Sequence, residues 1–123
     1  MIEHPTITIL GNVPAKSNTY RIGGNRLFKT ARLTEYEHNF YLQCGCYRDL
    51  KIQGFFEFYV DVYFPTMHSD LDNAMKALLD CLQMTNTIKN DNLCTKIVAR
   101  KFKDKLNPRV EIKIIEVEHD TRR

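Results

Sequence analysis

The chain has no apolar run long enough to span a lipid bilayer, because charged residues interrupt its longest hydrophobic stretches. Its first ten residues, MIEHPTITIL, lack the basic segment and the long apolar core of a secretory signal peptide. We therefore expect a cytoplasmic protein with no membrane partner. The sequence also has no internal repeat, no low-complexity segment, and no G-x-S-x-G, Walker or G-x-G-x-x-G motif.

Four cysteines are present, and in the cytoplasm they are expected to be reduced thiols. Cys44 and Cys46 form a C-x-C pair, whereas Cys81 and Cys94 lie further along the chain. A zinc site made of these four is one alternative, but their spacing matches no common zinc motif. We favour the interpretation that they serve as small hydrophobic residues.

Positive charge is concentrated near the start of the chain. Residues 1–33 contain five basic residues and one acidic residue, whereas the rest of the chain has 13 basic and 14 acidic residues. Such a segment is suited to binding a phosphate backbone, although a solvated basic loop has the same composition. The candidate DNA-binding residues are Lys16, Arg21, Arg26, Lys29 and Arg32.

Alternation of apolar and polar residues predicts four strands. The clearest is 55–64, in which every second residue from Phe56 to Phe64 is apolar, and Pro65 ends it. The last two strands are separated only by KDKLNP and are expected to pair as an antiparallel hairpin. The predicted strands are 6–10, 55–64, 93–102 and 109–117.

Two helices are predicted between these strands. Thr34 resembles an N-cap and Glu37 would complete its capping box, which predicts a helix from there to about Gly45. A second helix begins at Asp70, where apolar residues recur at helical spacing up to Leu82. Residues 15–32 show no sustained period and are expected to form a loop.

Together these elements predict one α+β domain over residues 1–123, because the length suits a single domain. We expect a mixed or antiparallel sheet covered on one face by the two helices.

The stretch DLDNAMK opens the second predicted helix with two aspartates. Taken alone, this stretch favours a structural interpretation, with Asp70 as a helix cap and Asp72 as a partner of the helix dipole and of Lys76. Asp91, in the turn before the next strand, favours a different interpretation if the fold brings it close to the other two. Three converging carboxylates would require a cation, and oxygen ligands suit Mg²⁺, with Mn²⁺ as a substitute. Lys76 would then neutralise charge on a phosphate.

The same residues resemble the RusA-type Holliday-junction resolvases. The resemblance rests on DLDNAMKALLD, on IKNDN around Asp91, and on the opening GNVPAKSNTYR, and it spans most of the chain. It implies a homodimer that binds a four-way DNA junction and cuts two strands symmetrically by metal-dependent hydrolysis, in DNA recombination and repair. It assigns metal binding to Asp70, Asp72 and Asp91, and an essential lysine to Lys76.

The chain departs from this family in two places. Many relatives have Lys-Pro where this chain has His68-Ser69, and an acidic doublet where it has Asn90-Asp91. These departures motivate a second hypothesis, a catalytically inactive junction-binding module of prophage origin. A third hypothesis is a nuclease for flaps, forks or structured RNA.

Overall fold

The computed structural model describes residues 1–14 and 20–118. No helix among these residues is long and apolar enough to cross a membrane. The elements in chain order are β1 (Ile2–Glu3), β2 (Ile7–Leu10), β3 (Tyr20–Gly23), β4 (Arg26–Lys29), α1 (Ala31–Gln43), the short 3₁₀ helix η2 (Gly45–Tyr47), β5 (Phe56–Phe64), α2 (Leu71–Met84), the 3₁₀ helix η3 (Asp91–Leu93), β6 (Cys94–Lys103) and β7 (Arg109–Glu116).

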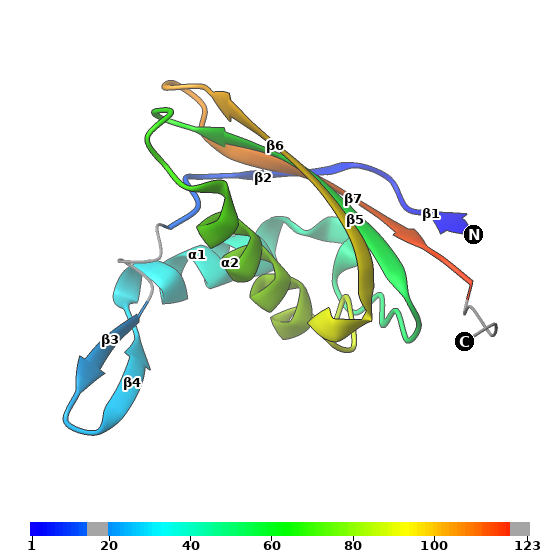
Figure 1. Ribbon diagram of the computed structural model, residues 1–123, viewed down its shortest axis with the longest axis horizontal. Helices are drawn as coiled ribbons and strands as arrows, with labels where there is room; N and C mark the ends of the chain where they lie inside the picture. Colours follow the sequence, from blue (N-terminus) through cyan, green and yellow to red (C-terminus); the bar gives the residue numbers. More distant parts are fainter. Residues whose placement is uncertain (15–19, 119–123) are drawn as a thin grey trace.

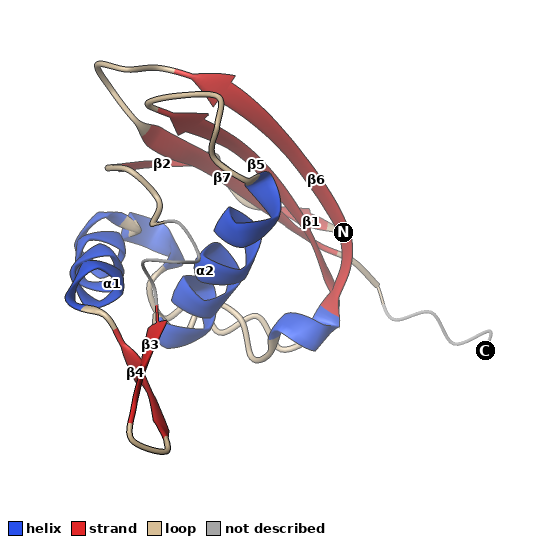
Figure 2. Ribbon diagram, turned by 60° about the vertical axis from the view of Figure 1, so that its left-hand side comes forward, coloured by secondary structure: helices blue, strands red, loops and turns tan. Residues whose placement is uncertain are grey.

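A five-stranded mixed sheet forms the body of the protein, and α1 and α2 cover one of its faces (Figures 1 and 2). The strand order is β1-β7-β5-β6, with β2 also paired to β7. β5 runs antiparallel to β7 and parallel to β6. The structure therefore confirms the predicted α+β class and the two helices on one face.

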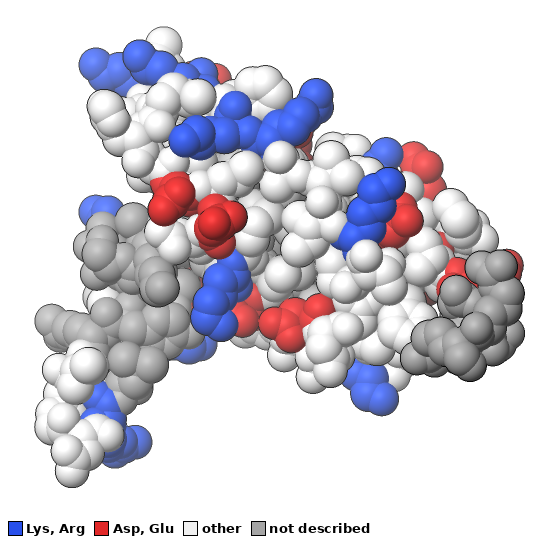
Figure 3. All heavy atoms as spheres, viewed as in Figure 1, with Lys and Arg blue, Asp and Glu red and all other residues white. Residues whose placement is uncertain are grey.

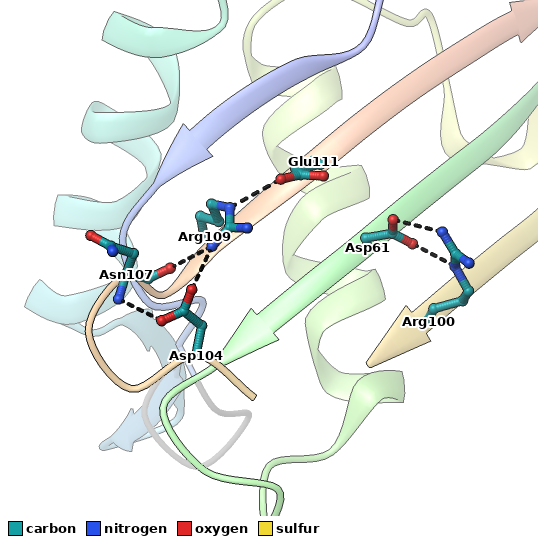
Figure 4. A network of polar contacts seen from close by, with 6 residues as sticks. All are labelled: Asp61, Arg100, Asp104, Asn107, Arg109 and Glu111. Atoms are coloured by element: carbon teal, nitrogen blue, oxygen red, sulfur yellow. Dashed lines mark hydrogen bonds and ion pairs between the residues drawn. The ribbon is translucent and has the colours of Figure 1, made fainter. Parts of the chain in front are cut away.

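The core lies between β5 and the helices. Residues of β5 alternate between buried and half-buried along its whole length, as their apolar spacing predicts. α2 buries a stripe of small and apolar residues that includes Ala74, Leu78 and Leu82. On the opposite face of the sheet, Asp61 of β5 and Arg100 of β6 form two hydrogen bonds of 2.8 and 2.9 Å (Figure 4).

The predicted hairpin between the last two strands is wrong, because β5 lies between β6 and β7. Alternation along a strand shows which residues are buried, but it does not identify the neighbouring strand. β5 has a fully apolar inner face, and the central position buries that face best. The connection from β6 to β7 therefore crosses the end of β5.

This crossing connection is held by polar contacts (Figure 4). The Asp104 N–H donates to the carbonyl of Phe64 at 2.8 Å. The Asp104 carboxylate accepts hydrogen bonds from the Asn107 N–H at 3.0 Å and from Arg109 at 2.9 Å. The Asn107 N–H first, and then the Arg109 guanidinium, hold the pKa of Asp104 below its ordinary value.

Helix α1 begins one turn earlier than predicted. Its N-cap is Thr30 rather than Thr34, and the Thr30 hydroxyl accepts a hydrogen bond from the Leu33 N–H at 3.3 Å. The earlier start places Leu33 on the buried face of the helix. Glu37 forms no capping box with Thr34, and it pairs instead with Lys29 at 2.9 Å.

Part of the predicted loop 15–32 is a β-hairpin made of β3 and β4. Ile22 lies opposite Leu27, and the turn passes through Gly24, whose φ of +61° favours glycine. The hairpin extends away from the sheet and the helices (Figure 2). Because its strands are short and rich in polar residues and glycine, they give no clear alternation in the sequence.

Tyr47 joins the start of the chain to β7. Its hydroxyl donates to the Pro5 carbonyl at 2.7 Å and accepts from the buried Ile114 N–H at 3.0 Å. The Tyr47 hydroxyl thus binds a backbone N–H of β7 in the gap between the segments that pair with β1 and with β2. Burial raises the pKa of Tyr47 to about 12.

We expect Tyr47→Phe to lower the free energy of unfolding by about 1–3 kcal/mol, because the substitution leaves the buried Ile114 N–H without a partner. Urea denaturation measures this change. Tyr41→Phe is the matched control, since it removes the same hydroxyl group from an exposed tyrosine and keeps the ring. Equal stability of the two variants would contradict the proposed role of the Tyr47 hydroxyl.

Candidate active site at the start of helix α2

Two of the predicted ligands lie where the chain leaves β5 and enters α2. Asp70 occupies the N-cap position with extended backbone angles, but its side chain makes no capping hydrogen bond. Asp72 lies in the first turn of the helix, and both residues are exposed. In Figure 3, acidic atoms lie over this turn with Lys and Arg atoms above and below them.

Only part of the structural explanation for these aspartates holds: Asp72 lies in the first turn, where the helix dipole favours a negative charge, but the capping hydrogen bond of Asp70 and the Asp72–Lys76 pair are absent. Lys76 does not pair with Asp72; its ammonium lies 3.9 Å from Asp80, and its side chain is 73 % exposed. Within the described residues, no hydrogen bond or ion pair occupies the carboxylate of Asp70 or Asp72. Both carboxylates are therefore available to an external ligand.

Asp91 lies at the opposite end of α2. Its N–H donates to the side-chain carbonyl of Gln83 at 3.1 Å, and Gln83 is the penultimate residue of the helix. Gln83 follows Asp70 by thirteen positions, which is roughly 20 Å along a helix. Figure 1 shows η3 beside the end of α2 that is far from β5's carboxyl end.

The parallel pairing of β5 and β6 explains this separation. Phe64 lies opposite Lys103, and Phe56 lies opposite Cys94. α2 must therefore run back along the sheet, so that Asp91, just before Cys94, lies at the other end of the domain. Oxygens bound to one Mg²⁺ lie about 2 Å from the ion. Asp70, Asp72 and Asp91 of a single chain are too far apart to bind the same ion in this way.

No group of three or more His, Cys, Asp or Glu side chains among residues 1–14 and 20–118 is placed to hold a metal ion. The cysteines form no such group either. Cys44 and Cys81 are buried, whereas Cys46 is exposed and Cys94 is half-buried. Burial raises the pKa of the Cys81 thiol, as expected for a cysteine that serves as a core residue.

The basic residues of the first segment fall on different elements. Arg26 lies on β4, with its guanidinium 5.4 Å from the centre of the Phe28 ring. Lys29 ends β4 and is joined to Glu37, and Arg32 is exposed in the first turn of α1. Arg21 lies on β3, but its side chain is outside the described part, as is the whole of Lys16.

Lys101 was missed by the sequence analysis, although it touches the candidate site. Its ammonium donates to the carbonyls of Met67 and Ser69, at 3.1 and 3.0 Å. One signal was available in the sequence: Lys101 follows Ile97 and Ala99 at period two, so it is a charged residue on the same side of the strand as two apolar ones.

The sequence profile of the family endodeoxyribonuclease RusA matches residues 11–115. The match covers most of the chain and includes β3 to β6, both helices and all but the last residue of β7. The chain therefore belongs to the RusA family of endodeoxyribonucleases, whose implied activity is the resolution of Holliday junctions. Among curated proteins, none matches the chain.

We expect Asp70→Ala to change the free energy of unfolding by less than about 0.5 kcal/mol, because its side chain makes no capping bond. Thr30→Ala should instead cost about 1 kcal/mol, because the Thr30 hydroxyl does cap α1. Thermal and urea unfolding of the two variants provide the comparison. A larger loss for Asp70→Ala than for Thr30→Ala would show that Asp70 is a structural cap.

Proposed function

We propose that this protein is a metal-dependent, structure-selective endonuclease that resolves four-way DNA junctions by paired symmetric nicks. Its place would be DNA recombination and repair in the cytoplasm. One observation carries the proposal: the aspartates of the D-x-D motif are exposed and have no partner within the described chain, in a member of a nuclease family.

Asp70 and Asp72 are the proposed ligands of Mg²⁺, with Mn²⁺ as a substitute. The donor set supports this assignment, because Mg²⁺ usually retains several waters and needs only one or two carboxylates besides a phosphate. When bound, the ion would activate water and stabilise the leaving oxygen. The extended backbone at Asp70 and the helical backbone at Asp72 hold the two carboxylates at the end of α2 that faces solvent.

Lys76 is the proposed phosphate-binding residue. It follows Asp72 by one helical turn, and its exposed ammonium makes only a long contact with Asp80. Such a surface pair is weak, so DNA can displace it. An ammonium at this place would neutralise charge that develops on the scissile phosphate.

The third ligand is proposed to come from a second copy of the chain. Asp91 of the same chain is too far away, but a two-fold homodimer can bring Asp91 of the partner subunit to Asp70 and Asp72. The same symmetry generates two identical sites, which the two cuts of a four-way junction require. The homodimer would thus complete the metal site as well as pair the nicks.

The basic hairpin and the start of α1 are proposed to hold the DNA backbone. The hairpin extends from the body and is exposed around its turn, where Ile22 is 78 % exposed. A two-stranded ribbon of this kind fits a DNA groove, and cationic side chains would offset the repulsion between phosphates and the acidic site. The proposed contacts are Lys16, Arg21, Arg26, Lys29 and Arg32.

A labelled four-way junction incubated with the protein and Mg²⁺ should be nicked at symmetric positions. Asp70→Asn should reduce the rate by on the order of 10³-fold, because several kcal/mol of charge stabilisation would be lost. Asp49→Asn, an exposed aspartate elsewhere on the surface, is the matched control. Junction binding should persist in both variants.

Three outcomes would contradict the proposal. Undiminished cleavage by Asp70→Asn would exclude the proposed site. Salt-sensitive junction binding without cleavage at any Mg²⁺ or Mn²⁺ concentration would favour the inactive binding module. Preferred cleavage of flaps, forks or structured RNA in competition would indicate a different substrate.

A further inference from the structure

A lysine of β6 ties down the connection that carries the candidate ligands. Lys101 donates one hydrogen bond to the carbonyl of Met67 and another to that of Ser69, at 3.1 and 3.0 Å. Ser69 directly precedes Asp70, so its carbonyl belongs to the peptide group that leads into the N-cap of α2.

The position of Lys101 within the sheet makes this contact possible. Lys101 lies opposite Val62 of β5, and Val62 is buried beneath the helices. Neighbours in register share a face of the sheet, so the lysine stem points toward the helix side. Because β6 is an edge strand, the ammonium can reach past Val62 to the end of α2.

The connection has few other attachments. Within residues 65–70, the remaining hydrogen bond is a local one, from the His68 N–H to the Thr66 hydroxyl at 3.4 Å. In the described part of the chain, Lys101 supplies the two hydrogen bonds that tie this connection to another element.

The ammonium of Lys101 also has no acidic partner in an ion pair among the described residues. Peptide carbonyls hold it instead, and hydrogen bonds from a charged donor are stronger than neutral ones. A half-buried cation bonded only to carbonyls is therefore a strong anchor for the backbone at Met67 and Ser69.

We propose that Lys101 is a positioning residue for the candidate metal site. It fixes the backbone at Ser69 and so sets where the Asp70 and Asp72 carboxylates project. The proposal rests on the proposed function, since it assumes that these two carboxylates bind the ion. Lys101 differs in role from Lys76, which is proposed to contact phosphate.

Three variants test this role. Lys101→Met removes both hydrogen bonds and keeps a long side chain, whereas Lys101→Arg can still donate to two carbonyls. Lys103→Met is the matched control, because it removes the same charge from an exposed lysine on the same side of the same strand. If Lys101→Met does not fold, Lys101→Gln takes its place: its shorter, uncharged side chain weakens both hydrogen bonds, so the same changes relative to Lys103→Met are expected.

The first measurement is hydrogen–deuterium exchange of the full chain without metal. Lys101→Met should accelerate exchange of the backbone amides in residues 66–72, whereas Lys103→Met should leave it unchanged. Equal exchange in these two variants would overturn the proposed tether.

The second measurement is a titration with Mn²⁺ that follows the broadening of amide resonances near Asp70. We expect Lys101→Met to raise about tenfold the Mn²⁺ concentration that gives half-maximal broadening. Lys103→Met should leave this concentration unchanged, and Lys101→Arg should keep it close to that of the parent. An unchanged titration for Lys101→Met, or no broadening even in the parent protein, would overturn the proposal. Because this readout needs no DNA, a parent that responds to Mn²⁺ but cuts no junction would refute only the nuclease proposal.

Discussion

The parallel pairing of β5 and β6 is the constraint on which the rest of the structure depends. Two adjacent parallel strands need a crossover connection, and α2 supplies it by returning along the sheet. This return fixes Asp70 and Asp72 at the carboxyl end of β5 and Asp91 at the amino end of β6. The separation between the candidate ligands is therefore a property of the topology, and side-chain rearrangement cannot remove it.

The same topology explains how the site combines acidic and basic groups. The end of β6 returns to the carboxyl end of β5, so Lys101 meets the connection into α2. Carboxylates at this place repel one another, and no side chain in the described part of the chain pairs with them to offset that repulsion. An external cation would neutralise these carboxylates, and a phosphate of the DNA backbone would pair with the nearby basic groups. The proposed homodimer would bring the candidate ligands together, because one chain places Asp70 and Asp72 at one end of α2 and Asp91 at the other.

Much of the fold could be predicted from local pattern. The period-two spacing from Phe56 to Phe64 identifies β5, and the stripe up to Leu82 identifies α2, because each pattern depends on burial of a single face. Strand order could not be predicted in this way, since pairing depends on distant segments. The hairpin β3–β4 was not predicted, because its four-residue strands are too short to show an apolar period.

The candidate site could likewise be predicted only in part. The motif from Asp70 to Lys76 identifies the residues and their helix, but their distance from Asp91 depends on whether β6 runs parallel or antiparallel to β5. Lys101 contributes through contacts with backbone carbonyls, which leave little trace in a sequence. The assignment of Asp91 to the metal site stays a prediction, since a single chain does not bring it to the other two.

The most direct test of this account mixes subunits of two inactive variants, Asp70→Asn and Asp91→Asn, and measures junction nicking with Mg²⁺ after subunit exchange. If each site takes Asp91 from the partner subunit, mixed dimers contain one intact site, and about a quarter of the parental sites should be restored. A mixture of Asp70→Asn and Asp72→Asn should remain inactive, because these two residues belong to the same chain at each site. A mixture of the first pair that stays as inactive as its components would contradict the account.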